Sequence, residues 1–175
     1  MLEPDAWVPL AEVMRPHGVR GEVRLKLFNK DSDVLLERDE VLVRLKDGEE
    51  HEVSVDAARR ANEAILMKLH SVDDRDRAAE LRGALLCVRR KDFPPVEAGE
   101  FYTCDVIGAK VTLADGGGDV GVVKDLLSYP TVDVLVIRAS DGGKDWEVPL
   151  VDALVRRVDP EAGLVELATL EGVER

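Results

Sequence analysis

The sequence predicts an all-β protein of two units with short helices, of which the first is a small closed barrel. Short runs rich in Val and Leu recur along all 175 residues, and turn-forming segments separate several of them. A Pro94-Pro95 pair near the middle cannot donate to a strand ladder and divides the runs into two groups. Because closing a sheet removes its exposed edges, we expect such short strands to form a closed barrel.

The first group of runs predicts five strands, at residues 7–14, 19–28, 40–46, 52–58 and 64–70. The segment Lys46-Asp47-Gly48-Glu49 between two of them has the composition of a hairpin turn. The second run alternates: Val19, Val23, Leu25 and Leu27 fall on one face, and Arg20, Glu22, Arg24 and Lys26 on the other. We expect this strand to be half-buried, with its charged face toward water or a partner.

One helix is predicted to follow, capped by Ser71 or Asp73 and ended by Gly83. A shorter helix is predicted within residues 32–38, and residues 85–90 are expected to return to the first sheet as a strand.

The second group of runs predicts another all-β unit, with strands at residues 109–113, 120–126, 132–138, 146–149, 154–158 and 164–168. Glycine-rich segments at residues 115–118 and 141–143 separate them as turns. The predicted domains are therefore residues 7–93 and 100–170, joined by a stiff linker at residues 94–99.

The charge is unevenly distributed between the two halves. Residues 1–95 carry 17 Lys and Arg against 20 Asp and Glu, a net charge of −3, whereas residues 96–175 carry 7 against 16, a net charge of −9. The second half is thus a poor candidate for binding nucleic acid and a better one for meeting a basic protein. An acidic surface that only maintains solubility is the alternative.

Most catalytic and cofactor chemistry lacks support in the sequence. The three histidines and the two cysteines, Cys87 and Cys104, are not spaced as a metal site, and no Gly-x-Ser-x-Gly segment is present. The triple glycine at 116–118 lacks the Lys-Ser/Thr of a phosphate-binding loop and is interpreted as a flexible turn. We expect a protein without cofactor, metal or enzymatic activity.

The first residues are acidic, and no apolar run approaches the roughly 20 residues that cross a bilayer. We therefore expect a cytoplasmic protein that does not bind membranes.

Two segments stand out as candidate binding sites. In the first, Arg15, His17 and Arg20 surround a turn with two glycines, and Arg24 and Lys26 extend the basic face. Guanidinium groups suit phosphate, so this patch is a possible RNA or partner contact. Alternatively, the arginines pair with nearby acids such as Glu12 and Glu22.

The second segment contains the adjacent aromatics Phe101 and Tyr102 just after the linker. If this segment is extended, neighbouring side chains point to opposite faces, and at least one ring has a chance of exposure. Exposed aromatics are efficient contact anchors. Alternatively, both rings fill the gap between two domains.

Together these segments resemble the RimM family of ribosome maturation factors. The resemblance rests on four motifs in order: residues 17–23 (HGVRGEV), 79–83 (AELRG), 99–108 (GEFYTCDVIG) and 148–159, which contains VPLV and VRRVD. It implies an N-terminal six-stranded barrel like the second domain of translation elongation factors and a C-terminal PRC-barrel. Phe101 stands where the family commonly has tyrosine.

The resemblance also implies a function. It suggests a non-catalytic, monomeric assembly factor that binds the maturing head of the small (30S) subunit through ribosomal protein S-nineteen and promotes 16S rRNA processing. Phe101, Tyr102 and Asp105 would then bind the partner, with possible contact to the rRNA elsewhere. A general RNA-binding β-barrel protein is the alternative.

Overall fold

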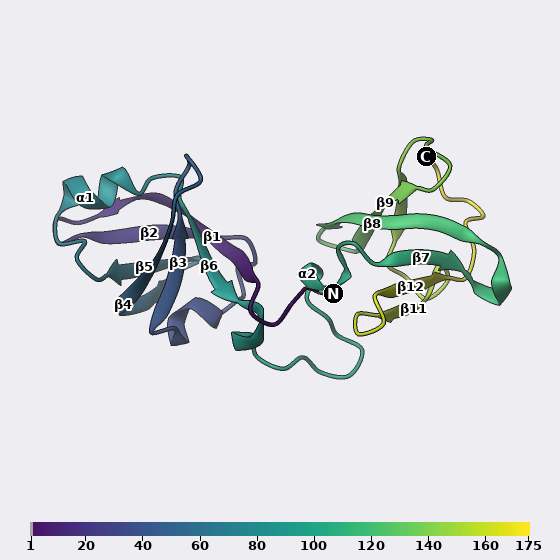
Figure 1. Cartoon of the computed structure of the whole chain (residues 1–175), viewed down its shortest axis with the longest axis horizontal. Coiled ribbons are helices and arrows are strands. Elements are labelled where there is room, and N and C mark those ends of the chain that lie inside the picture. Colours follow the sequence, from purple (N-terminus) through teal and green to yellow (C-terminus); the bar gives the residue numbers. More distant parts are fainter. Residues whose placement is uncertain (1) are drawn as a thin grey trace. The chain divides into compact units, whose positions relative to one another are not determined.

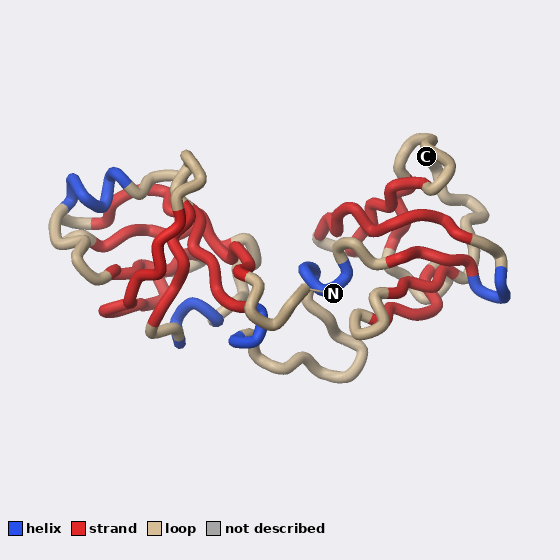
Figure 2. The backbone as a smooth tube through the Cα atoms, viewed as in Figure 1, coloured by secondary structure: helices blue, strands red, loops and turns tan. Residues whose placement is uncertain are grey.

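The computed structural model describes residues 2–175, and the chain separates into two compact units at Pro94 and Pro95. We call residues 3–94 the N-terminal unit and residues 95–175 the C-terminal unit. Strands make up most of the regular structure in both (Figures 1 and 2). Each unit has its own apolar core, and the predicted all-β class is confirmed.

The N-terminal unit is a closed barrel in which every neighbouring pair of strands is antiparallel. Its strands are β1 (Trp7–His17), β2 (Glu22–Leu27), β3 (Glu40–Arg44), β4 (Glu50–Ala61), β5 (Ala64–Leu69) and β6 (Leu85–Arg89). Their order around the barrel is β1-β2-β5-β4-β3-β6. Closure leaves no sheet edge to pair with another chain.

The alternation of β2 is confirmed, with one exception. Val23, Leu25 and Leu27 are buried in the barrel core. The prediction was wrong for Val19, whose side chain is 73% exposed. Val19 lies in the turn at residues 18–21, before β2 begins, so it does not share the inward direction of the strand.

Helices are short in this unit. They are η1 (Val34–Glu37), α1 (Arg75–Glu80) and η2 (Arg90–Asp92). The predicted caps of α1 were wrong: Asp74 caps it, and its carboxylate accepts the backbone N–H of Arg77 at 2.8 Å. Ser71 instead belongs to the preceding turn, with φ at 64°. Ala78 is buried and packs α1 against the barrel core.

The C-terminal unit is a curled six-stranded sheet around a second core. Its strands are β7 (Lys110–Leu113), β8 (Asp119–Ser128), β9 (Asp133–Ala139), β10 (Trp146–Pro149), β11 (Val155–Asp159) and β12 (Leu164–Leu167). Their order is β10-β9-β8-β7-β12-β11, and β12 pairs with β7 in parallel. Two short helices, α2 (Thr103–Val106) and η3 (Ala114–Gly116), replace segments predicted as extended or as a flexible turn.

None of the helices found in residues 2–175 combines the length and the apolar character needed to cross a membrane.

Candidate functional site

The basic turn predicted from the sequence is the hairpin between β1 and β2. We call it the basic hairpin and define it by Arg15, His17, Arg20, Arg24 and Lys26. Arg15 lies directly opposite Arg24 in the ladder, after a register shift between Val13 and Arg15. Like charges in opposite positions destabilise a strand pair. The structure keeps this pair on the outer face of the barrel.

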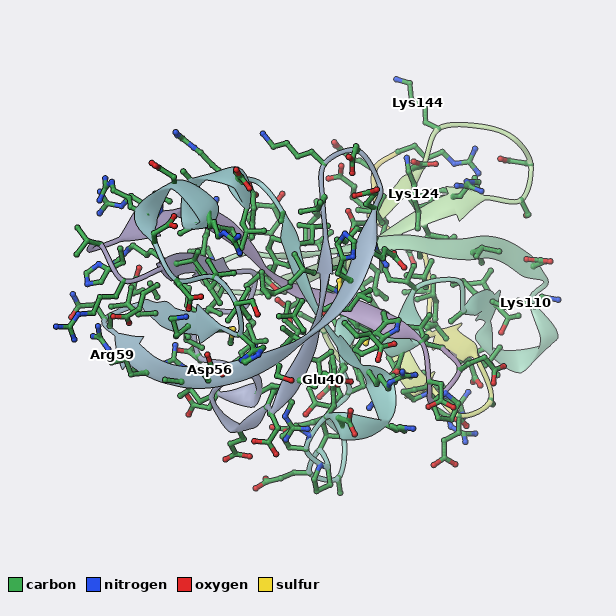
Figure 3. The ribbon with its side chains drawn as sticks, turned by 60° about the vertical axis from the view of Figure 1, so that its left-hand side comes forward. Glu40, Asp56, Arg59, Lys110, Lys124 and Lys144 are labelled. Atoms are coloured by element: carbon green, nitrogen blue, oxygen red, sulfur yellow. The ribbon has the colours of Figure 1, made fainter. Side chains whose placement is uncertain are left out.

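The acids near the basic hairpin do not neutralise it. Glu22 pairs instead with Arg59 of β4, with an Nη2–Oε2 distance of 3.0 Å (Arg59 is labelled in Figure 3). In the described part of the chain, none of the arginines and lysine of the hairpin lies within 4.0 Å of a carboxylate oxygen. Pairing with Glu12 or Glu22, the alternative drawn from the sequence, is therefore not the observed arrangement.

The helix α1 adds one further cation at this hairpin, and a second at the loop that precedes α1. Arg75 donates through Nη1 to the carbonyl oxygen of Gly18 at 3.1 Å, and Arg77 donates to that of Ser71 at 3.0 Å. These bonds fix the guanidinium groups while leaving their charge in place. No local sequence pattern indicates the contact between Arg75 and Gly18, because these residues are 57 positions apart.

Gly21 fixes the hairpin against the loop that precedes α1. Its φ is +86°, and a Cβ added there would lie 1.9 Å from the carbonyl oxygen of Val72. A side chain at this position would push the two segments apart. Close backbone packing of this kind holds the turn in one conformation.

The aromatic segment of the C-terminal unit stays extended only as far as Tyr102, because α2 begins at Thr103. Phe101 and Tyr102 are both half-buried, and Phe101 packs against the core of this unit. The backbone N–H of Asp105 donates to the carbonyl oxygen of Tyr102 at 2.9 Å, which turns the chain just after the ring. Asp105 itself is only 5% exposed. Its carboxylate thus lies below the surface that the segment presents.

Two exposed apolar residues lie close to this segment, and sequence reasoning missed both. Ile107 and Val122 are 37% and 42% exposed. Their segments adjoin, since the N–H of Gly108 donates to the carbonyl oxygen of Val123 at 2.8 Å. Ile107 was visible in the sequence only as part of a motif, and nothing there marked it as exposed.

Acids dominate the rest of the surface of the C-terminal unit. Most of its cations are already engaged with acids of the same unit: Lys110 with Asp119, Lys124 with Asp145, Arg156 with Glu166, Arg157 with Asp159, and Arg175 with Asp141. Asp125, Asp133, Glu147 and Asp152 have no ion pair among the described side chains. Negative charge therefore remains uncompensated on this unit.

Comparison with known proteins assigns both units. Residues 8–93 match the model of the RimM N-terminal domain, and residues 103–173 match that of the RimM PRC barrel domain. The chain belongs to the RimM family. The ribosome maturation factor RimM of Sorangium cellulosum is 48% identical over 167 residues, which cover 95% of this chain and 97% of that protein.

Other RimM proteins match over similar lengths. That of Myxococcus xanthus is 34% identical, covering 99% of this chain and 92% of its own. A crystal structure of RimM from Pseudomonas aeruginosa covers 93% of this chain and 96% of its own, with 26% identity and a TM-score of 0.47. The resemblance inferred from four motifs is thus confirmed over both units.

The side-chain chemistry of this RimM-family chain offers little reactivity. Among the side chains that the structure describes, no group of three or more His, Cys, Asp and Glu is arranged to hold a metal ion. Cys87 and Cys104 are both free thiols, and burial raises the pKa of Cys87. A raised pKa keeps a thiol in its unreactive protonated form.

Proposed function

We propose that this protein is a non-catalytic ribosome assembly factor. It binds the maturing head of the small (30S) subunit through ribosomal protein S-nineteen and promotes 16S rRNA processing. Family membership supports the general role, since relatives as close as 48% identity are ribosome maturation factors. The observation that carries the proposal is an acidic C-terminal unit with Tyr102 at its surface.

The geometry suggests that the residues of the aromatic segment have different roles. Tyr102, with Ile107 and Val122 nearby, supplies the apolar contact, because half-buried aromatics act as rigid anchors at interfaces. Phe101 packs inward and holds the segment on the core. Asp105, being buried, acts as a positioning residue that stabilises α2. The surrounding acids steer a basic ribosomal protein toward the anchor.

Binding alone can promote maturation. A factor with higher affinity for a partly folded head than for competing states increases the population of that state by its differential affinity. Release follows when the mature surface no longer fits the anchor. No chemical step on the RNA is required of the factor.

The chain provides a matched pair for testing the anchor, since Tyr102 and Tyr129 are its two tyrosines. Tyr129 is 52% exposed in the turn between β8 and β9 of the same unit. We expect Tyr102→Ala to reduce co-sedimentation with immature 30S subunits by about tenfold or more, as for a central interface aromatic. Tyr129→Ala should bind nearly as well as the unsubstituted protein. Equal loss from both variants would contradict an anchor at Tyr102.

The ribosomal protein itself can be tested directly. Purified S-nineteen should bind the full-length chain in the absence of RNA, and binding should weaken as salt screens the acidic surface. If the protein bound mature ribosomes but not immature 30S subunits, its partner would be a different one. Failure of the isolated proteins to associate would reject this partner.

A second candidate function, contact with rRNA, is favoured by the basic hairpin. Four cations without acid partners, beside Arg75 and Arg77, form a face suited to a phosphate backbone. Binding to a head-region rRNA fragment weakens as salt rises, and the slope of the logarithm of the binding constant against the logarithm of salt concentration measures this. Arg15→Ala should reduce that slope by about one. Arg59→Ala removes a cation already paired with Glu22 and serves as the control.

The outcome also separates the alternatives. Tight, salt-sensitive binding to any naked RNA, with no preference for S-nineteen, would favour a general RNA-binding barrel. Cleavage of precursor rRNA by the pure protein alone would overturn the non-catalytic proposal.

A further inference from the structure

Trp146 lies at the edge of the C-terminal sheet, where its ring contacts an arginine side chain. It opens β10, which is the edge strand beside β9, and its half-buried ring packs against the core. The guanidinium carbon of Arg175 lies 4.0 Å from the ring centroid. Arg175 also donates through Nη2 to Oδ2 of Asp141 at 2.7 Å. An aromatic face and a carboxylate thus hold one arginine side chain from two directions.

The loop before β10 shapes this site independently of Arg175. Oδ1 of Asp141 accepts the backbone N–H of Gly143 at 2.9 Å, which orients the carboxylate and leaves its other oxygen for a donor. A Cβ at Gly143 would lie 2.5 Å from Nη1 of Arg175, so the absence of a side chain leaves room for the guanidinium. Lys124, a neighbouring cation, is engaged by Asp145 at 2.7 Å and does not compete.

The N-terminal unit contains a similar stack with a different construction. There Arg89 lies 4.2 Å from the ring centroid of Trp7. Arg89 and Trp7 are directly opposite each other in the ladder of β1 and β6, so both ends of the contact belong to the barrel wall. The sheet holds the backbones of such a pair together, so the two residues stay neighbours as long as the barrel is folded.

Arg175, by contrast, lies beyond the last strand. The N–H of Ala168 still donates to the carbonyl oxygen of Leu154 at 2.8 Å, but residues 169–175 pair with no strand, although Leu170 and Val173 pack against the core. The N–H of Val173 bonds to Leu170 within one turn, and the N–H of Glu171 bonds to the hydroxyl of Thr169. Arg175 can therefore leave Trp146 without disturbing a strand ladder.

We propose that Trp146 and Asp141 form a recognition site for an arginine side chain, which Arg175 occupies in cis and an arginine of a cationic polypeptide occupies in trans. The choice of a cationic polypeptide as the ligand rests on the proposed function. The site itself rests on the contacts of Arg175. Its ligand is the guanidinium group, because this planar, weakly hydrated cation can stack on the ring while one N–H donates to the carboxylate, whereas an ammonium group is a compact, strongly hydrated charge.

Occupation in cis makes Arg175 a competitor for any incoming arginine. The apparent affinity for an external ligand falls in proportion to the fraction of molecules in which the site is open. One stacking contact and one exposed ion pair correspond to a modest closing preference, so Arg175→Ala should tighten external arginine binding by about fivefold to tenfold.

The probe for the test is N-acetyl-arginine amide, with N-acetyl-lysine amide as the comparison. Binding is followed by the NMR signal of the Trp146 indole N–H, while that of Trp7 reports any non-specific change. The arginine probe should shift the Trp146 signal, more tightly in Arg175→Ala than in the unsubstituted protein, and the lysine probe should bind more weakly. Adding Asp141→Asn to Arg175→Ala should remove most of the gain.

Lys144→Ala is the matched control, since Lys144 lies on the same loop and extends away into solvent (Figure 3). It should leave probe binding unchanged. The site is overturned if the arginine probe fails to shift Trp146 in Arg175→Ala, or if the lysine probe binds equally well. Arg175→Gln, which keeps a long polar side chain, repeats the test should the alanine variant lose the packing of Leu170 and Val173.

Co-sedimentation with immature 30S subunits separates this inference from the proposed function. Arg175→Ala should increase association if a partner arginine enters the site. If Arg175→Ala and the unsubstituted protein associated equally well, no arginine of that partner would replace Arg175 in the site, even where the probe binds. Loss of subunit binding in every variant, with the probe still shifting Trp146, would reject the proposed function and leave the arginine site standing.

Discussion

The two units of this chain share a β architecture and differ in the charge that they leave uncompensated. In the N-terminal unit, cations of the basic hairpin have no acid partner within the described residues, while Glu22 pairs with Arg59. In the C-terminal unit, most cations are paired and acids such as Asp125 and Asp133 are left over. The formal net charge of −12 conceals this opposition.

The difference teaches that ion pairing, more than composition, determines which charges can meet a partner. The N-terminal unit is nearly neutral overall, yet it carries Arg15 opposite Arg24 at an energetic cost. A particle of RNA and basic protein offers complementary surfaces to both kinds of patch. The separate cores allow each unit to keep its own surface chemistry.

Substitutions in the two separate cores should have the largest effects on stability. Leu25 is fully buried in the first core and Leu135 in the second. Leu25→Ala and Leu135→Ala should each reduce the free energy of unfolding by about 2–5 kcal/mol, but only for the unit that carries the substitution. Each variant is the control for the other.

Denaturant unfolding can report the two units separately, because Trp7 lies in β1 and Trp146 in β10. Single-tryptophan versions of the protein would follow one transition each. If Leu25→Ala shifted both transitions equally, the units would be one cooperative structure and the comparison would fail.

The hairpin glycines provide the next largest effect, confined to the N-terminal unit. Gly21→Ala places a Cβ against the carbonyl oxygen of Val72 at positive φ, and we expect a loss of about 3 kcal/mol. Gly18→Ala has positive φ but open space around the new atom, so it should cost only about 1 kcal/mol. Thermal unfolding of this unit measures both, and equal losses would show that the contact with Val72 is unimportant.

Much of the fold could be predicted because strand patterns are local. Alternation placed Val23, Leu25 and Leu27 in the core, and the turn glycines separated the hairpins. The prediction for Val19 was wrong because the alternating pattern in the sequence extends past the start of the strand into the preceding turn, where side chains do not alternate between two faces. The parallel pairing of β7 with β12 joins segments more than 50 residues apart, and no local pattern encodes it.

The candidate site was less accessible to sequence reasoning. The motifs identified the basic hairpin and the aromatic segment, but not which rings or charges face outward. The short helix α2 has too few residues to show a periodicity, so the burial of Asp105 was not foreseeable. Arg75 joins the hairpin only through a tertiary contact with Gly18, and Arg175 reaches Trp146 in the same way.

Removing one member of the like-charge pair should slightly stabilise the protein, whereas the substitutions above destabilise it. Arg15→Ala removes the cation opposite Arg24, and we expect the free energy of unfolding to stay unchanged or rise by about 0.5 kcal/mol. Arg59→Ala breaks an exposed ion pair with Glu22 and should lower it by a similar amount. Urea titrations at low salt measure both. A clear loss of stability in Arg15→Ala would show that this cation has a structural role.

The smallest expected effect concerns two exposed carboxylates, one in each unit. A hydrogen bond from Lys91 lowers the pKa of Asp5, and one from Arg175 lowers the pKa of Asp141, in each case below the usual 3.8. A carboxyl group whose pKa is lower in the folded state stabilises that state above the unfolded pKa. This contribution is lost as the pH falls through the folded value.

Arg175→Ala should therefore raise the pKa of Asp141 toward 3.8 while leaving that of Asp5 unchanged, and carboxyl NMR titration resolves the two groups. In the unsubstituted protein, protonation of Asp141 below the usual carboxyl pKa should let Arg175 leave the Trp146 ring, which shifts the NMR signal of Trp146. This shift should disappear in the same variant. A pKa of Asp141 that does not move would mean that Arg175 does not hold the carboxylate in solution. In that case the stack on Trp146 would be the weaker of the two tryptophan contacts, since Arg89 lies opposite Trp7 in the β1–β6 ladder and is also paired with Glu52.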